Sequence, residues 1–271
     1  MTGLGIIAGS GDLPRLIAED YSAKDGSALI IDFEGIEVPW ASEHNNFTAR
    51  FEQPEAIFEE LRNANCSKVV MAGAMQRPVL DPTKADPTFA AIVPRLMGAL
   101  SEGDDAALRV VLSMFEGAGF EVIAPHEVLK NLLMEDGCPT IAQPTDYDKS
   151  DAMRATEILK TTGPLDIGQG TVVAGGLCLG LETLQGTASM LEFVRYSDPD
   201  LRPERGLLMK APKTGQDRKV DLPSIGPDTM DQLASAHLSG IVIEAGGVLV
   251  INRDEVIKRA DAHGLFLWSR P

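Results

Sequence analysis

The sequence predicts an α/β protein with two domains, and three observations support this prediction. Short apolar runs alternate with amphipathic stretches through the first half of the 271 residues, as in the strand–helix units that build a parallel sheet. A glycine-rich loop, Gly9-Ser10-Gly11-Asp12, connects the first apolar run to the first amphipathic stretch. Beyond residue 150 the apolar runs are shorter and richer in glycine, and helices no longer alternate regularly with strands.

The elements of the first half can be placed by their periodicity. We expect strands over residues 4–8, 28–32, 68–72 and 120–124, and helices over residues 13–23, 54–64, 89–100, 104–116 and 126–134. Pro14 stands in the first turn of the first helix, where its missing N–H removes no hydrogen bond. Because strands and helices alternate, we predict an N-terminal Rossmann-like domain with a parallel sheet.

The boundary between the domains is predicted from a loss of pattern. Residues 135–150 contain turn formers and charges without a hydrophobic period, so we assign residues 1–134 to the first domain, 135–150 to a linker and 151–271 to the second domain. In the second domain we expect helices over 151–161, 186–196, 228–237 and 254–263, and strands near Thr171 and Leu179, over 206–211 and 265–268, and as a pair flanking Gly246-Gly247. These elements predict a C-terminal α+β domain with a mixed sheet.

The charge of the chain limits its partners. Forty Asp and Glu against 24 Lys and Arg give a net charge of −16 at pH 7, which repels nucleic acid, so we expect no nucleic acid partner. A small anionic ligand is compatible with this charge, because backbone N–H groups or a bound divalent metal reverse its sign locally. The three cysteines are scattered and no apolar run reaches the length of a membrane span, which predicts a cytoplasmic protein.

The loop Gly9-Ser10-Gly11-Asp12 is a candidate phosphate site, because it follows the first strand and precedes a helix. Asp32 ends the second strand, where an acid commonly binds the ribose of a nucleotide. Pro14 replaces the third glycine of the dinucleotide fingerprint, so a plain tight turn is the alternative interpretation.

Two further segments of the first half could carry chemistry. Arg77, close after Gly73, follows the third strand, where its guanidinium could bind phosphate; the alternative is a surface arginine before a turn. Asp104 and Asp105 open a helix, so they are candidates for capping its N-terminus as well as for binding a ligand.

The densest polar groupings of the second half are residues 166–170 and 210–229. The longer segment alternates charged residues with prolines and glycines, and such a loop can bind metal and phosphate together or simply be solvated. The side chains of interest in these groupings are those of Asp166, Gln169, Lys210, Lys213, Gln216, Asp217, Arg218, Asp221 and Asp228.

With these segments in view, the whole chain resembles the LpxI family of UDP-2,3-diacylglucosamine pyrophosphatases. The resemblance rests on short motifs that keep their order and spacing over nearly all 271 residues. These motifs are Gly9-Ser10-Gly11-Asp12-Leu13-Pro14, Gly73 with Arg77-Pro78, Gly103-Asp104-Asp105, Asp166 with Gly168-Gln169, Glu182 with Gly186-Thr187, Lys210-Ala211-Pro212, Gln216-Asp217, Asp221-Leu222-Pro223, Ile225-Gly226-Pro227-Asp228-Thr229 and Glu244-Ala245-Gly246.

The resemblance implies a Mg²⁺-dependent hydrolase of lipid A synthesis that cleaves UDP-2,3-diacylglucosamine into UMP and 2,3-diacylglucosamine 1-phosphate (lipid X), with water attacking the β-phosphorus. It also implies that the first domain binds the UDP end and the second domain the acylated sugar phosphate. We expect a homodimer and weak peripheral contact with the inner face of the inner membrane. Met190, Leu191, Phe193 and Val194 are candidates for an acyl-chain groove, and ordinary core is the alternative for them.

The resemblance implies three groups of site residues, which bind substrate, bind metal or take part in catalysis. Those expected to bind substrate are Gly9, Ser10, Gly11, Asp12, Asp32, Gly73, Arg77, Thr187, Lys210 and Lys213. Those expected to bind metal are Asp104, Asp105 and Asp217. Those expected to be catalytic are Asp166, Gln169, Asp221, Asp228 and the residue at position 188.

Position 188 departs from the family motif, which has an acid after Gly-Thr where this chain has Ala188. One interpretation is an engineered Asp-to-Ala substitution that disables catalysis and traps ligand; the other is natural variation, with Asp221 or Asp228 supplying the carboxylate. Two other functions stay open from the sequence: a nicotinamide-dependent oxidoreductase built on the same first domain, and a non-catalytic nucleotide or lipid binding module.

Overall fold

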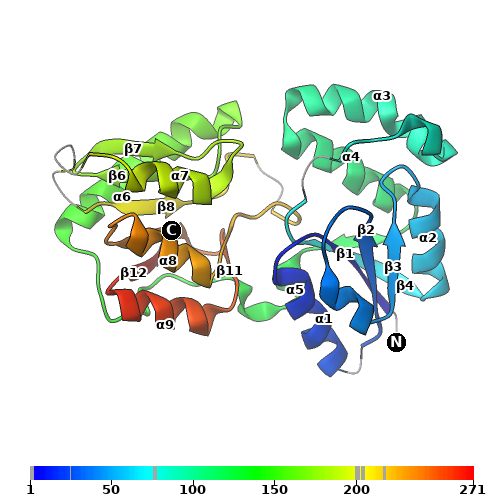
Figure 1. Cartoon of the computed structure of the whole chain (residues 1–271), viewed down its shortest axis with the longest axis horizontal. Helices are drawn as coiled ribbons and strands as arrows, with labels where there is room; N and C mark the ends of the chain where they lie inside the picture. Colours follow the sequence, from blue (N-terminus) through cyan, green and yellow to red (C-terminus); the bar gives the residue numbers. More distant parts are fainter. Residues whose placement is uncertain (1–2, 25, 76–77, 199–201, 203–204, 216–217) are drawn as a thin grey trace. The chain divides into compact units, whose positions relative to one another are not determined.

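The computed structural model describes residues 3–24, 26–75, 78–198, 202, 205–215 and 218–271, and for Glu102 and Asp104 it describes the backbone alone (Figure 1). The chain divides into two compact units. Unit 1 contains Met1–Lys130 and Lys219–Asp221, and unit 2 contains Asn131–Arg218 and Leu222–Pro271. The predicted fold class is confirmed: unit 1 has a parallel sheet and unit 2 a mixed one.

Unit 1 is built on a five-stranded sheet in the order β3-β2-β1-β4-β5. Its strands are β1 (Gly3–Ala8), β2 (Ala28–Phe33), β3 (Asn46–Ala49), β4 (Cys66–Ala72) and β5 (Glu121–Ile123). All neighbouring strands are parallel. The chain order reverses between β1 and β4, so the carboxyl ends of these two strands flank the switch point at which Rossmann-like sheets bind ligands.

The helices of unit 1 are α1 (Leu13–Ala23), α2 (Pro54–Asn63), α3 (Pro87–Glu102), α4 (Asp104–Gly117) and α5 (Pro125–Val128). Phe58 of α2 and Phe115 of α4 stack edge to face, with ring centroids 5.3 Å apart, in the core on one face of the sheet. Val220 of the segment Lys219–Asp221 packs against this same core.

Two elements of unit 1 differ from the prediction. The helix expected over 126–134 ends at Val128, because Leu133 instead pairs with Leu249 in an isolated β-bridge and Leu132 is buried. Strand β3 was not predicted, because it is a four-residue edge strand in which only Ala49 is buried, so it shows no hydrophobic run.

Unit 2 contains a five-stranded sheet in the order β12-β10-β8-β6-β7. Its strands are β6 (Gly170–Ala174), β7 (Leu177–Leu181), β8 (Leu207–Lys210), β10 (Gly240–Glu244) and β12 (Phe266–Arg270). Strands β8, β10 and β12 are parallel, whereas β6 is antiparallel to β7 and β8. A separate two-stranded sheet joins β9 (Ser224–Ile225) to β11 (Leu249–Val250).

The prediction that two strands flanking Gly246-Gly247 pair with each other is wrong. Strand β10 is a buried central strand that pairs with β8 and β12, and β11 belongs to the other sheet. The turn between them is held by other segments, because Ala245 N–H donates to Arg270 and Gly246 N–H donates to Met134.

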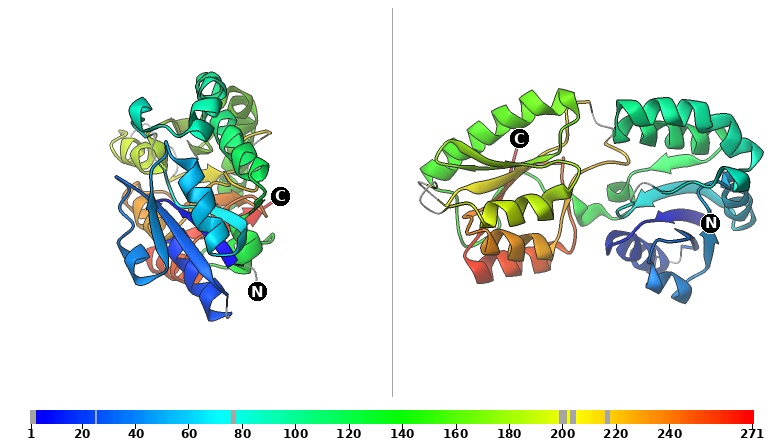
Figure 2. Two further views of the ribbon diagram at one scale, coloured as in Figure 1. Left: turned by 90° about the vertical axis from the view of Figure 1, so that its right-hand side faces the viewer. Right: turned by 45° about the horizontal axis from the view of Figure 1, so that its top comes forward.

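Helices cover both faces of the mixed sheet (Figures 1 and 2). Helix α6 (Asp146–Thr162) packs on one face through Ala152, Ala155 and Leu159. Helices α7 (Gly186–Arg195), α8 (Pro227–Ser235) and α9 (Arg253–His263) supply the apolar core on the other face. Among the described residues, no helix has both the length and the apolar character needed to cross a bilayer.

Residues 135–150, predicted as a linker, are a folded part of unit 2. Gly137 forms a β-bridge with Ser269, and the hydroxyl of Thr140 accepts the N–H of Leu267 at 3.0 Å. Helix α6 begins at Asp146, before the expected start at residue 151, because Thr145 and Asp148 form a capping box.

Candidate functional site

The glycine loop of unit 1 is tied to the loop that follows β4. The N–H of Gly9 donates to the Ala72 carbonyl at 2.8 Å, and the backbones of Ser10 and Ala74 exchange two hydrogen bonds of 2.9 Å. The Ser10 hydroxyl donates to the Ala74 carbonyl at 3.1 Å. The segments that follow β1 and β4 are therefore joined by hydrogen bonds at the switch point of the sheet.

Three glycines of this edge serve different purposes. A Cβ at Gly9 would lie 2.5 Å from the Ala74 carbonyl oxygen, and a Cβ at Gly73, which has φ of +91°, would lie 2.7 Å from the Gly9 carbonyl carbon. Both positions therefore require glycine for close backbone approach. Gly11 has φ of +95° but open space around it, and Ser10, Gly11 and Asp12 are exposed. The loop is both a tight turn and an open surface.

The start of α1 lies beside this open surface. Asp12 stands at the N-cap position, but its side chain does not cap the helix and lies 3.6 Å from Arg15. The first backbone N–H groups of a helix have no partner within the helix and carry partial positive charge. The loop and the start of α1 together form the kind of surface that binds phosphate.

Asp32, predicted to bind ribose, contacts strand β3. Its Oδ1 accepts from Asn46 Nδ2 at 3.2 Å and its Oδ2 accepts from the Thr48 hydroxyl at 2.9 Å. These partners could not be foreseen, because β3 itself was not predicted. The ribose role of Asp32 stays a prediction.

The predicted acidic pair at residues 104 and 105 lies in the first turn of α4, next to Gly103 with φ of +141°. The carboxylate of Asp105 forms an ion pair of 2.8 Å with Arg109, one helical turn away. Arg77 and Asp217 lie outside the described residues, as does the side chain of Asp104.

A second polar edge lies in unit 2, where β6 begins and β8 ends. Gly170 is in register with Lys210, which is buried with 6% of its surface exposed. The Lys210 ammonium donates to the Ser224 carbonyl at 3.1 Å and lies 3.9 Å from Glu182 Oε2. Burial lowers the pKa of Lys210, and the charge of Glu182 partly opposes this effect.

Other predicted residues gather at the same edge. Asp166 has φ of +57° and its carboxylate contacts the ammonium of Lys213 at 2.5 Å. The carbonyl of Gln169 accepts from the N–H of Ala211 at 3.0 Å, which fixes the backbone of Gln169 beside the end of β8. Asp166, Gln169, Lys210 and Lys213 are thus brought together.

Sequence reasoning missed a role for Glu182 at this edge, although Glu182 belongs to a motif of the family resemblance. Glu182 packs closely against two glycines: a Cβ at Gly170 would lie 2.5 Å from its side-chain Oε2, and a Cβ at Gly168 would lie 2.0 Å from its backbone carbonyl oxygen. The glycines on either side of Gln169 are the signal in the sequence that could have indicated a closely packed side chain here.

Thr187 and Ala188 lie in the first turn of α7, after Gly186 with φ of +80°. Thr187 is half-buried and Ala188 is exposed. Of the residues considered for an acyl groove, Met190, Leu191 and Val194 are core residues, and Phe193 is 68% exposed.

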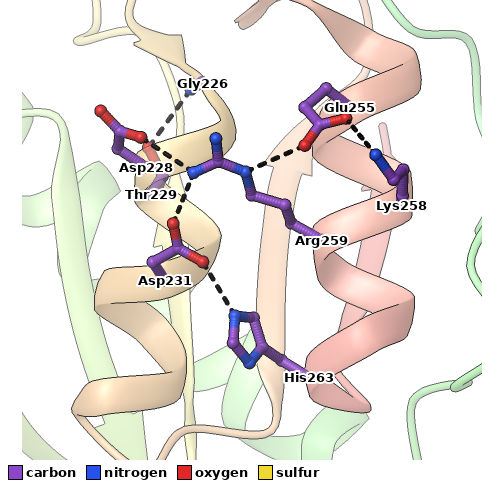
Figure 3. A network of polar contacts seen from close by, with 8 residues as sticks. All are labelled: Gly226, Asp228, Thr229, Asp231, Glu255, Lys258, Arg259 and His263. Atoms are coloured by element: carbon purple, nitrogen blue, oxygen red, sulfur yellow. Dashed lines mark hydrogen bonds and ion pairs between the residues drawn. The ribbon is translucent and has the colours of Figure 1, made fainter.

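Asp228 belongs to a network between α8 and α9 (Figure 3). Arg259 Nη1 lies 3.0 Å from Asp228 and 2.5 Å from Asp231, and Arg259 Nε lies 3.2 Å from Glu255. His263 Nε2 lies 2.8 Å from Asp231. Asp228 is thereby held in a network of ion pairs, whereas Asp221 lies in the segment Lys219–Asp221 that groups with unit 1.

The carboxylates of the described residues do not gather into a protein-only metal site. Among these residues, no three His, Cys, Asp or Glu side chains converge as a metal-binding group. Mg²⁺ in phosphoryl-transfer enzymes is commonly held by one or two carboxylates together with substrate phosphates and water. The described carboxylates are dispersed, and such single carboxylates are compatible with that mode of binding.

Nearly the whole chain matches known protein families and a known relative. Residues 3–132 match the model of the LpxI N-terminal domain, and residues 135–268 match that of the LpxI C-terminal domain. The chain is 37% identical over 271 residues to UDP-2,3-diacylglucosamine pyrophosphatase LpxI of Caulobacter vibrioides (strain ATCC 19089 / CIP 103742 / CB 15), covering 98% of this chain and 97% of the relative.

Two solved structures show weaker similarity. CobK precorrin-6A reductase has a TM-score of 0.32 and 12% identity, covering 100% of this chain and 89% of that one. N5-carboxyaminoimidazole synthase from Aspergillus clavatus has a TM-score of 0.24 and 14% identity, covering 65% of this chain and 39% of that one. The two domain matches, in order and over both halves, and the full-length relative lead to one conclusion: the chain belongs to the LpxI family.

Proposed function

We propose that this protein hydrolyses the diphosphate of UDP-2,3-diacylglucosamine, releasing UMP and 2,3-diacylglucosamine 1-phosphate in lipid A synthesis. Membership of the LpxI family and the name of the Caulobacter relative support the reaction. The observation that carries most weight in the structure is the open glycine loop at the switch point of the parallel sheet, because this is where a nucleotide phosphate is bound in Rossmann-like folds.

In this proposal, Gly9, Ser10, Gly11 and Asp12 surround the phosphates of the uridine nucleotide, with Gly73 holding the loop in place. Gly11 offers open space in which a phosphate could approach the backbone, and the start of α1 offers N–H groups. Arg77 and the ribose contact of Asp32 complete the proposed nucleotide site. In the fingerprint of nicotinamide-binding domains the third glycine allows close packing of the helix against the strand, and Pro14 occupies that position here.

The edge of unit 2 is proposed to bind the sugar phosphate. Lys210 and Lys213 supply positive charge in a chain of net charge −16. Lys213 pairs with Asp166, and the backbone of Gln169 bonds to Ala211, the residue after Lys210. Thr187, in the first turn of α7, adds a hydroxyl donor.

Hydrolysis by water at the β-phosphorus forms one P–O bond to water and breaks the P–O bond to UMP, which leaves. We propose that the carboxylates of Asp104, Asp105 or Asp217 would hold Mg²⁺, which would supply positive charge to neutralise the diphosphate. Asp166, Gln169, Asp221 and Asp228 are the candidates for orienting water or accepting its proton. Asp228 would first have to leave its ion pair with Arg259, which makes it the weakest of the four.

The substrate carries two acyl chains, so we propose a cytoplasmic enzyme with weak peripheral contact at the inner membrane, as a homodimer. The net charge of −16 opposes attraction to anionic lipid, so the contact would be local and apolar.

The test is release of UMP from UDP-2,3-diacylglucosamine, with Mg²⁺ present or chelated. We expect turnover that requires the metal. Thermal unfolding is measured in parallel with UMP and with NADH. Stabilisation by NADH and not by UMP, without UMP release, would favour the oxidoreductase; stabilisation by UMP without turnover would favour a binding module.

A further inference from the structure

Lys210 and Glu182 form a buried pair of opposite charges in which a carboxylate oxygen has no hydrogen-bond partner among the described residues. Their side chains are 8% and 12% exposed, and the ammonium lies 3.9 Å from Glu182 Oε2, which is too long for a hydrogen bond. Glu182 Oε2 is buried and has no hydrogen-bond partner among the described residues. The Ser224 carbonyl accepts from the ammonium, which has three N–H donors.

The backbone is shaped around the carboxylate of Glu182. The N–H of Glu182 donates to the Gly170 carbonyl at 2.8 Å, which fixes the end of β7 against the start of β6. A side chain at Gly170 would displace Glu182 Oε2, since its Cβ would lie 2.5 Å from that oxygen. The position of this carboxylate is therefore set by the local fold.

The other charged side chains at this edge have partners of their own. Lys213 pairs with Asp166 at 2.5 Å, and Arg218 pairs with Glu244 at 2.7 Å. Among the described residues, Glu182 is the carboxylate that faces Lys210.

A buried ion pair is a poor way to stabilise a fold, because desolvation of the two charges offsets much of their attraction and apolar residues often do as well. An unpaired buried oxygen adds a further penalty. Stabilisation of the fold therefore does not explain why this buried ion pair is present. At 3.9 Å, Glu182 attracts the ammonium without accepting a hydrogen bond from it. Ser224 takes one of the three N–H donors, and within the described part of the chain this leaves donors for a ligand oxygen.

We propose that Glu182 is the positioning residue of Lys210: it keeps the ammonium charged and fixed at the edge of the sheet, with donors left for a phosphate oxygen of the sugar phosphate. This role rests on the proposed function, in which Lys210 binds that phosphate. In this role Glu182 acts on the substrate only through Lys210.

Four variants test the role by Michaelis kinetics of UMP release from UDP-2,3-diacylglucosamine. Glu182→Gln keeps the shape and removes the charge, and Lys210→Met removes the cation. The double variant carries both changes. Gly170→Ala leaves the net charge unchanged and displaces the carboxylate of Glu182, because the new Cβ would lie 2.5 Å from its Oε2. We expect KM to rise about 10-fold to 100-fold in each variant, with kcat within about twofold of the wild type.

Thermal unfolding of each variant separates positioning from a structural role. The double variant removes both buried charges, so its melting temperature should recover relative to the single variants. Its KM should nevertheless stay as high as that of Lys210→Met. Glu192→Gln, which removes an exposed carboxylate on α7, is the matched control and should keep the wild-type KM.

The outcomes are distinct. A double variant that folds and has the wild-type KM would show that the pair is only structural and would overturn the proposal. An unchanged KM in both Glu182→Gln and Gly170→Ala would also overturn it. If the wild type itself releases no UMP, the proposed function fails, and the role of Glu182 falls with it.

Discussion

Gly9 and Gly73 come so close that neither has room for a side chain: a Cβ on Gly73 would lie 2.7 Å from the carbonyl carbon of Gly9. This approach joins the loop after β1 to the loop after β4 at the point where the strand order reverses. The glycine loop of the candidate nucleotide site is therefore held in place by a backbone contact.

The first prediction concerns this contact. Gly73→Ala should lower the free energy of unfolding by about 1–3 kcal/mol or more, because alanine is strained at φ of +91° and also collides with Gly9. UMP binding should weaken in parallel, as measured by calorimetric titration. Gly98→Ala is the control: Gly98 lies inside α3 with open space around it, and alanine there should stabilise the protein by about 0.5–1 kcal/mol. A Gly73→Ala protein with full stability and UMP affinity would refute this account of the loop.

The second prediction separates two roles of Asp32. Its carboxylate accepts hydrogen bonds from Asn46 and Thr48, so Asp32→Ala should cost about 1–2 kcal/mol of unfolding free energy. A ribose contact would also make Asp32→Ala bind UMP more weakly, whereas Thr48→Val should lose stability alone. If the wild type, Asp32→Ala and Thr48→Val bind UMP equally well, Asp32 does not contact the ribose and its role is limited to its hydrogen bonds with β3.

The third prediction concerns pH. The hydrogen bond from His263, followed by that from Arg259, lowers the pKa of Asp231 below its usual 3.8. The group is protonated less readily in the folded protein, so its contribution to stability is present above that value and is lost as the pH falls through the folded-state pKa. We expect Asp231→Asn to flatten the decline of Tm below about pH 4, and more so at low salt.

Glu192→Gln provides the comparison for this pH experiment, since Glu192 is an exposed carboxylate outside the network. It should retain the wild-type dependence of Tm on pH. Identical profiles for wild type and Asp231→Asn would mean that the α8–α9 network has no energetic effect in solution.

The fourth prediction concerns position 188. Ala188 is exposed in the first turn of α7, so an aspartate fits there and favours the helix dipole. If the family motif supplies a catalytic carboxylate at this position, Ala188→Asp should increase the rate of UMP release. Ser189→Asp adds the same charge at the next, also exposed, residue and should not. If the wild type releases UMP rapidly and Ala188→Asp does not increase that rate, position 188 does not supply the catalytic carboxylate, and Asp221 becomes the first candidate for it.

The sequence indicated the parallel sheet and the glycine loop well, because buried parallel strands are continuous apolar runs and the loop has a distinctive composition. Strand β3 escaped prediction because only Ala49 of its residues is buried. The extra turn of α6 depends on the reciprocal capping of Thr145 and Asp148, inside a segment whose prolines and glycines suggested a linker.

The polar edge of unit 2 was only partly predictable. Lys210, Lys213 and Asp166 stood out by their charge. The meeting of Glu182 with Lys210 depends on the register of β6 against β7 and β8, and long-range register is not encoded in local composition. For the same reason, the sequence did not reveal that Arg259, on another helix, pairs with Asp228.

The central claim is hydrolysis at the β-phosphorus, and isotope labelling tests it most directly. UDP-2,3-diacylglucosamine is incubated with the protein and Mg²⁺ in ¹⁸O-labelled water, and both products are analysed by mass spectrometry. We predict one ¹⁸O atom in 2,3-diacylglucosamine 1-phosphate and none in UMP. Label in UMP would place the attack at the α-phosphorus, and the absence of both products would contradict the proposed activity itself.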